Sequence, residues 1–193
     1  MAIYMWRGGQ TFSYSYDFKN KSVATCQTDW RAFPIWTSMS FWSNGMYKNS
    51  AGYQQICSPS ITLSTANEIT ITANITAVYD KDIAFWLYRS YTSGSVSSSI
   101  FRSTAYNNTK LRFFNTDSTT TTLYSGTTLT SGNHTITITL NLWSKTVSFS
   151  DGNNTWSYTL TDDQVTDIRN NVWLVCAVAK TNNYFADISI TAN

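Results

Sequence analysis

The sequence predicts an all-β protein, an antiparallel two-sheet jelly-roll sandwich with one short surface helix. The strongest observation is residues 132–160, where three runs alternate apolar and polar side chains with period two and are separated by turn-forming residues. Three such strands cannot stand alone, because their apolar face needs a second sheet to cover it. Further strand-like runs recur along the chain without an internal repeat, so two packed layers of sheet are the expected architecture.

The three runs within residues 132–160 show which face of the sheet is buried. Turns are expected at residues 143–145 and 151–154, where short polar residues and glycine gather. Between the turns, threonine, serine and asparagine fill every second position, so the remaining positions form the buried face. These apolar positions are Ile136, Ile138, Leu140 and Leu142, then Val147 and Phe149, then Trp156, Tyr158 and Leu160.

The other elements follow from local patterns. Residues 161–169 predict the helix, because Thr161 and Gln164 form a capping box. Residues 172–179 are almost continuously apolar, as expected of a central strand covered on both faces. Residues 22–53 are irregular and aromatic, and predict one or two short strands and a long crossing loop with most of its rings packed beneath it. Further strands are expected at residues 11–20, 60–64, 68–79, 83–90, 99–105, 110–115, 120–125 and 184–191.

Composition limits the domain organisation and the class of partner. The 193 residues suit one domain, expected at residues 11–193 after an N-terminal arm at residues 1–10. Charged residues are 12% and aromatic residues 16% of the chain, a composition typical of extracellular or particle-borne β proteins. A net charge of +2 without a basic stripe argues against nucleic-acid binding. Residues 1–7 do not form a secretory signal, and no apolar run approaches transmembrane length, so no membrane insertion is expected.

The cysteines and acidic residues do not predict a metal site or a disulfide framework. Cys176 lies in an apolar run and is expected to be a small buried core residue. Cys26 and Cys57 are expected to be two free thiols, with a disulfide between them as the alternative. Asp80 and Asp82 lack a third acidic partner for calcium and are expected at a solvated hairpin tip. With one histidine in the chain, we expect no metal and no cofactor.

Three segments resemble a known superfamily: YSYDFKN near the start, GNHTITITLNLWSKTVSFSDG in the middle and YFADISITAN at the end. Their order resembles the concanavalin A-like lectin/glucanase superfamily, which includes laminin G-like domains. The resemblance covers residues 11–193 and implies that the first and last strands are neighbours. The segments MAIYMWR and YDFKNKSVATCQTDW also resemble small structural proteins of bacteriophages or prophages.

The catalytic and metal-binding motifs of that superfamily are not matched. Its glucanases carry two glutamates and an aspartate two or three residues apart on one strand, whereas Glu68 is the sole glutamate here and has Ala66 and Thr70 at that spacing. The Glu-x-Asp cluster through which legume-type lectins hold calcium and manganese is missing too, and His134 is expected to be a surface turn residue. We therefore expect no enzymatic activity, and a glycoside hydrolase is the disfavoured alternative.

Composition and resemblance together favour a non-enzymatic virion structural protein, a phage-like tail, fibre or capsid-surface component that contributes to host-surface glycan attachment. The expected partners are other virion proteins or copies of itself, together with cell-surface glycans. The expected location is a virion assembled in the host cytoplasm. The alternative is a free, lectin-like carbohydrate-binding module with an extracellular location.

Two sets of residues are candidates for partner contacts. The apolar Ile3, Tyr4, Met5 and Trp6 precede a Gly-Gly joint and form either a partner-docking arm or a first edge strand. The second set is the outward-facing aromatic and basic residues of two strands, because flat rings stack on sugar faces and arginine donates to hydroxyls. Alternatively, the crossing loop or a neighbouring subunit covers these rings, or the ligand-binding rings are Trp143 and Trp156. The second set consists of Trp86, Tyr88, Arg112 and Phe114.

Overall fold

The structure is a computed structural model of the 193-residue chain. It describes residues 4–5, 12–33, 39–48, 54–77, 83–89, 99–106, 108–114, 120–125, 131–153, 155–178 and 183–193. Within these ranges, the backbone alone is described at residues 4–5, 31–33, 48, 54–55, 77, 83–86, 88, 99, 101–106, 108–114, 120–125 and 177. No helix among the described residues has the length and apolar character needed to cross a membrane.

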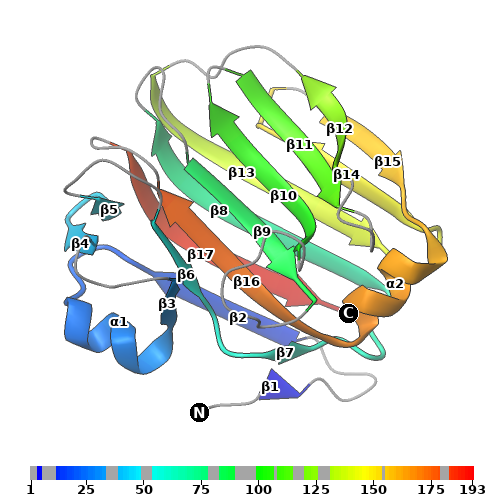
Figure 1. The fold of residues 1–193 in the computed structure, drawn as a ribbon, viewed down its shortest axis with the longest axis horizontal. Coiled ribbons are helices and arrows are strands. Elements are labelled where there is room, and N and C mark those ends of the chain that lie inside the picture. Colours follow the sequence, from blue (N-terminus) through cyan, green and yellow to red (C-terminus); the bar gives the residue numbers. More distant parts are fainter. Residues whose placement is uncertain are drawn as a thin grey trace.

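The described strands form two sheets that pack face to face, which confirms the predicted sandwich (Figure 1). One sheet has nine described strands and the other eight. The nine-stranded sheet contains β1 (Tyr4–Met5), β3 (Arg31–Phe33), β6 (Gln54–Cys57), β7 (Ile61–Thr62), β9 (Ile83–Tyr88), β10 (Ser99–Tyr106), β11 (Asn108–Phe114), β12 (Thr120–Ser125) and β16 (Asn171–Val178). The eight-stranded sheet contains β2 (Phe12–Asp17), β4 (Met39–Trp42), β5 (Gly45–Lys48), β8 (Glu68–Ala77), β13 (Gly132–Asn141), β14 (Thr146–Ser150), β15 (Thr155–Thr159) and β17 (Tyr184–Ala192).

Strand order agrees with the expected topology. β13, β14 and β15 are consecutive antiparallel neighbours, as residues 132–160 predict. β2 pairs with β17, so the first long strand and the last are adjacent, as the resemblance implied. β16 pairs with β9 on one side and with β6 and β7 on the other, which makes it central. Among the described strands, only the short pairing of β1 with β7 is parallel.

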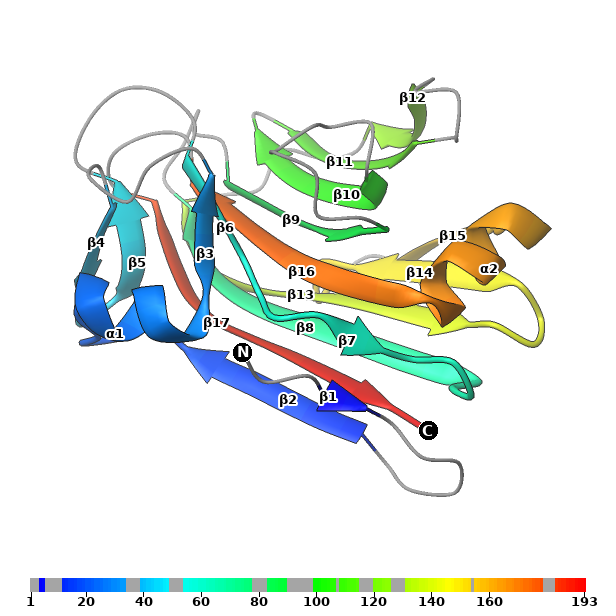
Figure 2. The same cartoon turned by 60° about the horizontal axis from the view of Figure 1, so that its bottom comes forward.

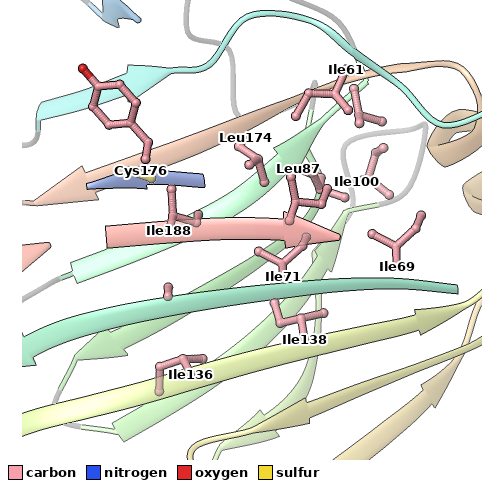
Figure 3. Packing of buried hydrophobic residues seen from close by; sticks show 14 of the residues in the cluster. Ile61, Ile69, Ile71, Leu87, Ile100, Ile136, Ile138, Leu174, Cys176 and Ile188 are labelled. Carbon is pink, nitrogen blue, oxygen red and sulfur yellow. The ribbon is translucent and has the colours of Figure 1, made fainter. Parts of the chain in front are cut away.

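The core lies between the two sheets, where Figure 2 shows β16 and β9 facing β13, β8 and β17. In β8, Ile69, Ile71 and Ala73 are fully buried, while the threonines between them are partly exposed. Leu87 and Leu174 cover them from the opposite sheet (Figure 3). Each such side chain gains about 1.5–3 kcal/mol from burial, so the alternating pattern drives the packing.

The predicted helix is confirmed as α2 (Asp162–Arg169). The Thr161 hydroxyl accepts a hydrogen bond from the backbone N–H of Gln164, whose side-chain oxygen accepts one from the backbone N–H of Thr161. This reciprocal capping box satisfies two N–H groups at the helix start. Ile168 is fully buried, so it anchors the helix on the core.

A second helix, α1 (Val23–Asp29), corrects the expectation of a single helix. It lies in the stretch that was expected to be irregular, and it begins where the Ser22 hydroxyl accepts a hydrogen bond from the backbone N–H of Thr25. Its seven residues are too few to show a helical apolar period. The same stretch and its continuation also contain β3, β4, β5 and β6, which is more strand structure than its sequence predicts.

Contacts with β2 and the core hold α1 in place. The Tyr16 hydroxyl donates to the Asp29 carboxylate at 2.9 Å and lies 3.5 Å from the Cys26 thiol. The Trp30 ring is buried between the rings of Tyr16 and Phe18, so it belongs to the main core instead of a satellite under a loop. Burial raises the pKa of both Tyr16 and Cys26, which therefore stay protonated at neutral pH.

All three cysteines are free and buried. Cys176 lies in the core cluster, and Cys26 and Cys57 are not joined, so both sequence expectations are confirmed.

We predict that Gly45→Ala destabilises the protein more than Gly132→Ala. Both glycines have positive φ, +119° at Gly45 and +139° at Gly132, so alanine at either position costs about 1–3 kcal/mol in strain. At Gly45 a Cβ atom would also lie 2.3 Å from the carbonyl oxygen of Phe185, whereas at Gly132 no heavy atom lies within 4 Å. Urea unfolding of both variants measures the difference. Equal losses would contradict the close approach at Gly45.

Candidate functional site

A hollow of about 410 Å³ opens on the outer face of the eight-stranded sheet, away from the core. We call it the outer groove. Its floor is formed by β8, β13 and β17, and its sides by Lys19 and the turn between β4 and β5. Its lining residues are Lys19, Ser43, Asn44, Asn74, Ile75, Thr76, Asn133, His134, Thr135, Ala186 and Asp187.

Hydrogen bonds between strands fix the polar side chains of the floor. The Thr135 hydroxyl donates to the Asn74 side-chain oxygen at 2.7 Å, and the Asn74 amide donates to Asp187 Oδ1 at 2.6 Å. A second pair joins Thr76 to Asn133, with the hydroxyl donating at 2.6 Å. Each side chain keeps hydrogen-bonding capacity after these bonds. The floor therefore presents fixed hydroxyl, amide and carboxylate groups to a ligand.

Charge in the outer groove centres on Lys19. Its ammonium nitrogen lies 3.5 Å from Asp187 Oδ2 and 3.8 Å from Asp17 Oδ1. All three side chains are partly exposed, so these ion pairs stabilise the fold by no more than about 1 kcal/mol each. Two carboxylates therefore share one ammonium, and of the two Asp187 lines the groove while Asp17 lies outside its lining. The site is richer in acceptors than in cationic donors.

A bulge in β17 places Asp187 in the groove. Phe185 pairs with Ile75 and Asp187 pairs with Asn74, which leaves Ala186 as an extra residue on β17. A bulge bends a strand and re-aims the side chains beside it. Phe185 is fully buried, and Asp187 is on the outer face. Gly45 packs against the backbone of this bulge, so the turn at residues 43–44 lies beside Asp187.

His134 differs from its expected position in a surface turn. It belongs to β13, where it pairs with Ile75, and its side chain is half-buried. It shares its strand parity with Ile136, which faces the core. The sequence around His134 has no acidic residue, and in the fold His134 borders the outer groove with Asp187, although its side chain is on the opposite face of β13 from Thr135.

The predicted residues lie on two strands that flank β10, with Trp86 and Tyr88 on β9 and Arg112 and Phe114 on β11. Trp86 pairs with Arg102 of β10, and Arg112 pairs with the same residue from the other side. Tyr88 pairs with Ser99, and Phe114 with Thr120 of β12. The backbone therefore brings the four positions to one region of the nine-stranded sheet. Their side chains lie outside the described part of the chain, so their role stays a prediction.

The burial of Val175, which pairs with Trp86, is relevant to whether the predicted rings are covered. Val175 of β16 pairs with Trp86 on one side and with Cys57 on the other. The adjacent residues Leu174 and Ile56 belong to the core cluster, so Val175 and Cys57 are on the outer face of the sheet. Both are nevertheless fully buried. The outer face of the nine-stranded sheet is thus covered at this level. This is consistent with the covered-surface alternative, which stays a prediction because the side chains of residues 86 and 88 are not described.

Trp143 and Trp156, the alternative ligand-binding rings, have different environments in the structure. Trp143 lies in the turn between β13 and β14 and is 85% exposed. Trp156 of β15 is half-buried and packs on the Phe149 ring, with centroids 5.6 Å apart. Trp143 therefore exposes its ring, while part of the Trp156 ring is buried against the core.

The N-terminal candidates are partly described. Tyr4 and Met5 form β1, which pairs in parallel with Ile61 and Thr62 of β7. This backbone pairing favours the edge-strand interpretation. Ile3 and Trp6 lie outside the described residues, and partner docking stays a prediction.

Metal-binding side chains do not converge among the described residues. No three side chains of His, Cys, Asp or Glu come together there in a way that could hold a metal ion. Glu68 is exposed at the start of β8 and pairs with Asn141. Burial raises the pKa of the Cys26 and Cys176 thiols, so neither is a ready nucleophile. Among the described residues, the groups available to a ligand are the hydrogen-bonding side chains of the outer groove.

Comparison with known proteins supports the fold. No protein-family model matches the sequence, and no curated protein matches it. The structure is similar to winged bean acidic lectin, solved with methyl-α-D-galactose, at a TM-score of 0.60 and 13% identity over 95% of this chain and 99% of that one. It is similar to the CBM2 module of the evolved Dit protein of Lactobacillus casei BL23 phage J-1, at a TM-score of 0.58 and 11% identity over 95% of both chains. It is also similar to the carbohydrate recognition domain of Emp46p, at a TM-score of 0.60 and 10% identity over 93% and 94%. At these identities the likeness establishes a lectin-type jelly-roll sandwich, and the function needs its own argument.

We predict that the double variant Trp86→Ala, Tyr88→Ala separates a binding surface from a packed one. If these rings bind glycans, the variant folds with an unchanged circular dichroism spectrum and loses binding to cell-surface glycans. If they are covered, the variant loses about 3–5 kcal/mol per ring, as buried aromatic residues do, and unfolds at lower urea. Intact folding with unchanged binding would contradict both roles.

Proposed function

We propose that the protein is a non-enzymatic carbohydrate-binding sandwich that serves as a surface component of a phage-like virion and contributes to attachment to host glycans. The outer groove carries this proposal. Saccharides present many hydroxyl groups, each able to donate and accept a hydrogen bond. The groove offers amide, hydroxyl and carboxylate partners that are already oriented before a ligand arrives.

Preorganisation gives these groups their value for binding. Asn74 cannot turn its amide freely, because Thr135 holds its oxygen and Asp187 holds its nitrogen. A ligand that binds such a network does not bear the entropic cost of ordering it. The Asp187 carboxylate can accept a charge-assisted hydrogen bond from a sugar hydroxyl, which is about twice as strong as a neutral one. The cavity of about 410 Å³ falls within the usual range for small-ligand sites.

The comparisons support the carbohydrate part of the proposal through proteins of the same fold. Winged bean acidic lectin was solved with a galactoside, and the Emp46p domain is described as a carbohydrate recognition domain. The virion part draws support from the module of a phage Dit protein. The low charge and the Ser/Thr-rich outer face suit a particle surface as well. A free lectin-like module is the second candidate, favoured by the plant lectins among the similar structures.

We predict that Asp187→Asn weakens glycan binding about ten- to a hundredfold. The change preserves the size of the side chain and the acceptor for Asn74, but it replaces the second carboxylate oxygen with a donor and removes one of the two carboxylates paired with Lys19. Loss of a hydrogen bond to a charged group costs about 1.5–3 kcal/mol. A glycan array followed by calorimetry measures the affinity.

The matched control is Asp163→Asn, which changes an exposed carboxylate on α2 outside the groove. It should bind as the unaltered protein does. Bound oligosaccharide should be recovered uncleaved, and Glu68→Gln should not alter this result. An unaltered protein that binds no glycan on the array would refute the proposal, and turnover that depends on Glu68 would refute its non-enzymatic part.

We also predict that a variant beginning at Gln10 folds but fails to join its particle. Its sandwich should persist, because β1 contributes a pairing of just two residues to the described sheet. Co-purification with virion proteins or self-assembly by light scattering provides the measurement. Assembly equal to that of the full chain would leave β1 as an edge strand alone, and a full chain that stays monomeric and binds sugars would favour the free lectin-like module.

A further inference from the structure

We propose that the outer groove extends onto an aromatic platform formed by Trp42, Tyr47 and Tyr184, and that its ligand is a neutral oligosaccharide of at least two sugar rings. This inference rests on the proposed carbohydrate-binding function. It assigns one ring of the ligand to the polar groove and another to the platform.

The platform is built from rings on three neighbouring strands. The centroids of Trp42 and Tyr47 lie 4.5 Å apart, and those of Tyr47 and Tyr184 lie 5.6 Å apart. Both separations are in the range favoured by aromatic pairs. β4 carries Trp42, β5 carries Tyr47 and β17 carries Tyr184. The rings therefore support one another across the sheet and hold the outermost ring in place.

The platform adjoins the outer groove at two points. Trp42 directly precedes Ser43, which lines one side of the groove. Tyr184 pairs with Thr76, which lines its floor. Trp42 itself is not among the lining residues, so its ring lies beyond the groove edge. A ligand confined to the groove would not reach the platform fully, whereas a chain of two or more rings would occupy both.

Trp42 is too exposed for its main role to be packing. It is 55% exposed, although its ring already contacts Tyr47. Among the described residues the other large exposed hydrophobic side chain is Trp143. The other two platform residues, Tyr47 and Tyr184, are half-buried. Trp42 thus presents a free, flat and apolar ring next to a polar site, and such a ring can stack on the C–H face of a pyranose while the groove takes its hydroxyls.

The charges of the groove select against acidic sugars. Lys19 is the cation among the described lining side chains, and Asp17 and Asp187 both lie within 4 Å of it. A carboxylate ligand would therefore meet an ammonium that is already paired with two carboxylates, and the Asp187 carboxylate would repel it. Neutral hydroxyl groups bind acceptor oxygens without this cost. The preferred class is a neutral glycan.

The test compares Trp42→Ala with Trp143→Ala; both tryptophans are exposed, the first at the end of β4 beside the groove and the second in the turn after β13. The probes are glucose, galactose and N-acetylglucosamine, their β1,4-linked di- to tetrasaccharides, and one sialylated trisaccharide. Binding is measured by calorimetry, with indole fluorescence as a second readout. The unaltered protein should bind its best tetrasaccharide about tenfold or more tightly than the matching monosaccharide, and the sialylated probe more weakly than its neutral parent.

Trp42→Ala should abolish this gain with chain length and leave monosaccharide affinity unchanged, while Trp143→Ala should change neither. Trp42→Leu should give the same result as Trp42→Ala if alanine impairs folding, because leucine keeps apolar volume but has no flat ring. Equal weakening of mono- and oligosaccharides, or no change in either, would overturn the platform. If Asp187→Asn weakens binding while chain length has no effect, the platform fails and the proposed function stands. Absence of any sugar binding would remove both.

Discussion

The structure depends on one constraint: two sheets must bury opposing apolar faces, and a strand presents every second side chain to that layer. β8 and β13 satisfy it together, because they pair over ten residues from Gly132 opposite Ala77 to Asn141 opposite Glu68. A slip of one residue would turn the isoleucines of one strand toward solvent. β16 meets the same layer from the opposite sheet with Leu174 and Cys176. Strand register, more than any single contact, holds the sandwich in one arrangement.

The same alternation determines what the outer face can be. On β8 and β13 the outward positions are threonines over most of their length, paired as Thr70 with Thr139 and Thr72 with Thr137. The groove forms where the regular pattern ends, at Asn74, at the Asp187 bulge and at the turn that Gly45 allows to approach it. The groove thus lies where the sheet departs from regularity.

Much of the fold could be predicted from the sequence because local pattern carries it. The strands at residues 132–160, the central strand with Cys176 and the Thr161 capping box all depend on residues close together in the chain. α1 could not be predicted with the same ease, because a single cap at Ser22 and seven residues give no period. The groove was missed for another reason. Lys19, Asn74 and Asp187 are far apart in sequence and meet through strand register; the one available signal was that Asn74 and Asp187 interrupt outward runs of Ser and Thr. The surface at Trp86 and Arg112 was assigned by alternation alone, and alternation cannot say what covers a sheet.

The extra residue Ala186 lets β17 place Asp187 on the outer face without moving its apolar side chains out of the core. On one side of it Phe185 is in the core, and on the other Ile188 and Ile190 return to the core in regular register. The one-residue shift in register is confined to the bulge. Outer-face residues around the bulge can therefore change without shifting the apolar side chains that follow. The groove and its aromatic border can therefore diversify in ligand preference while the sandwich beneath them stays the same. If the proposed function holds, a change in the host glycan could be met by a few substitutions at residues 42–44, 184 and 187, while Phe185 stays in the core.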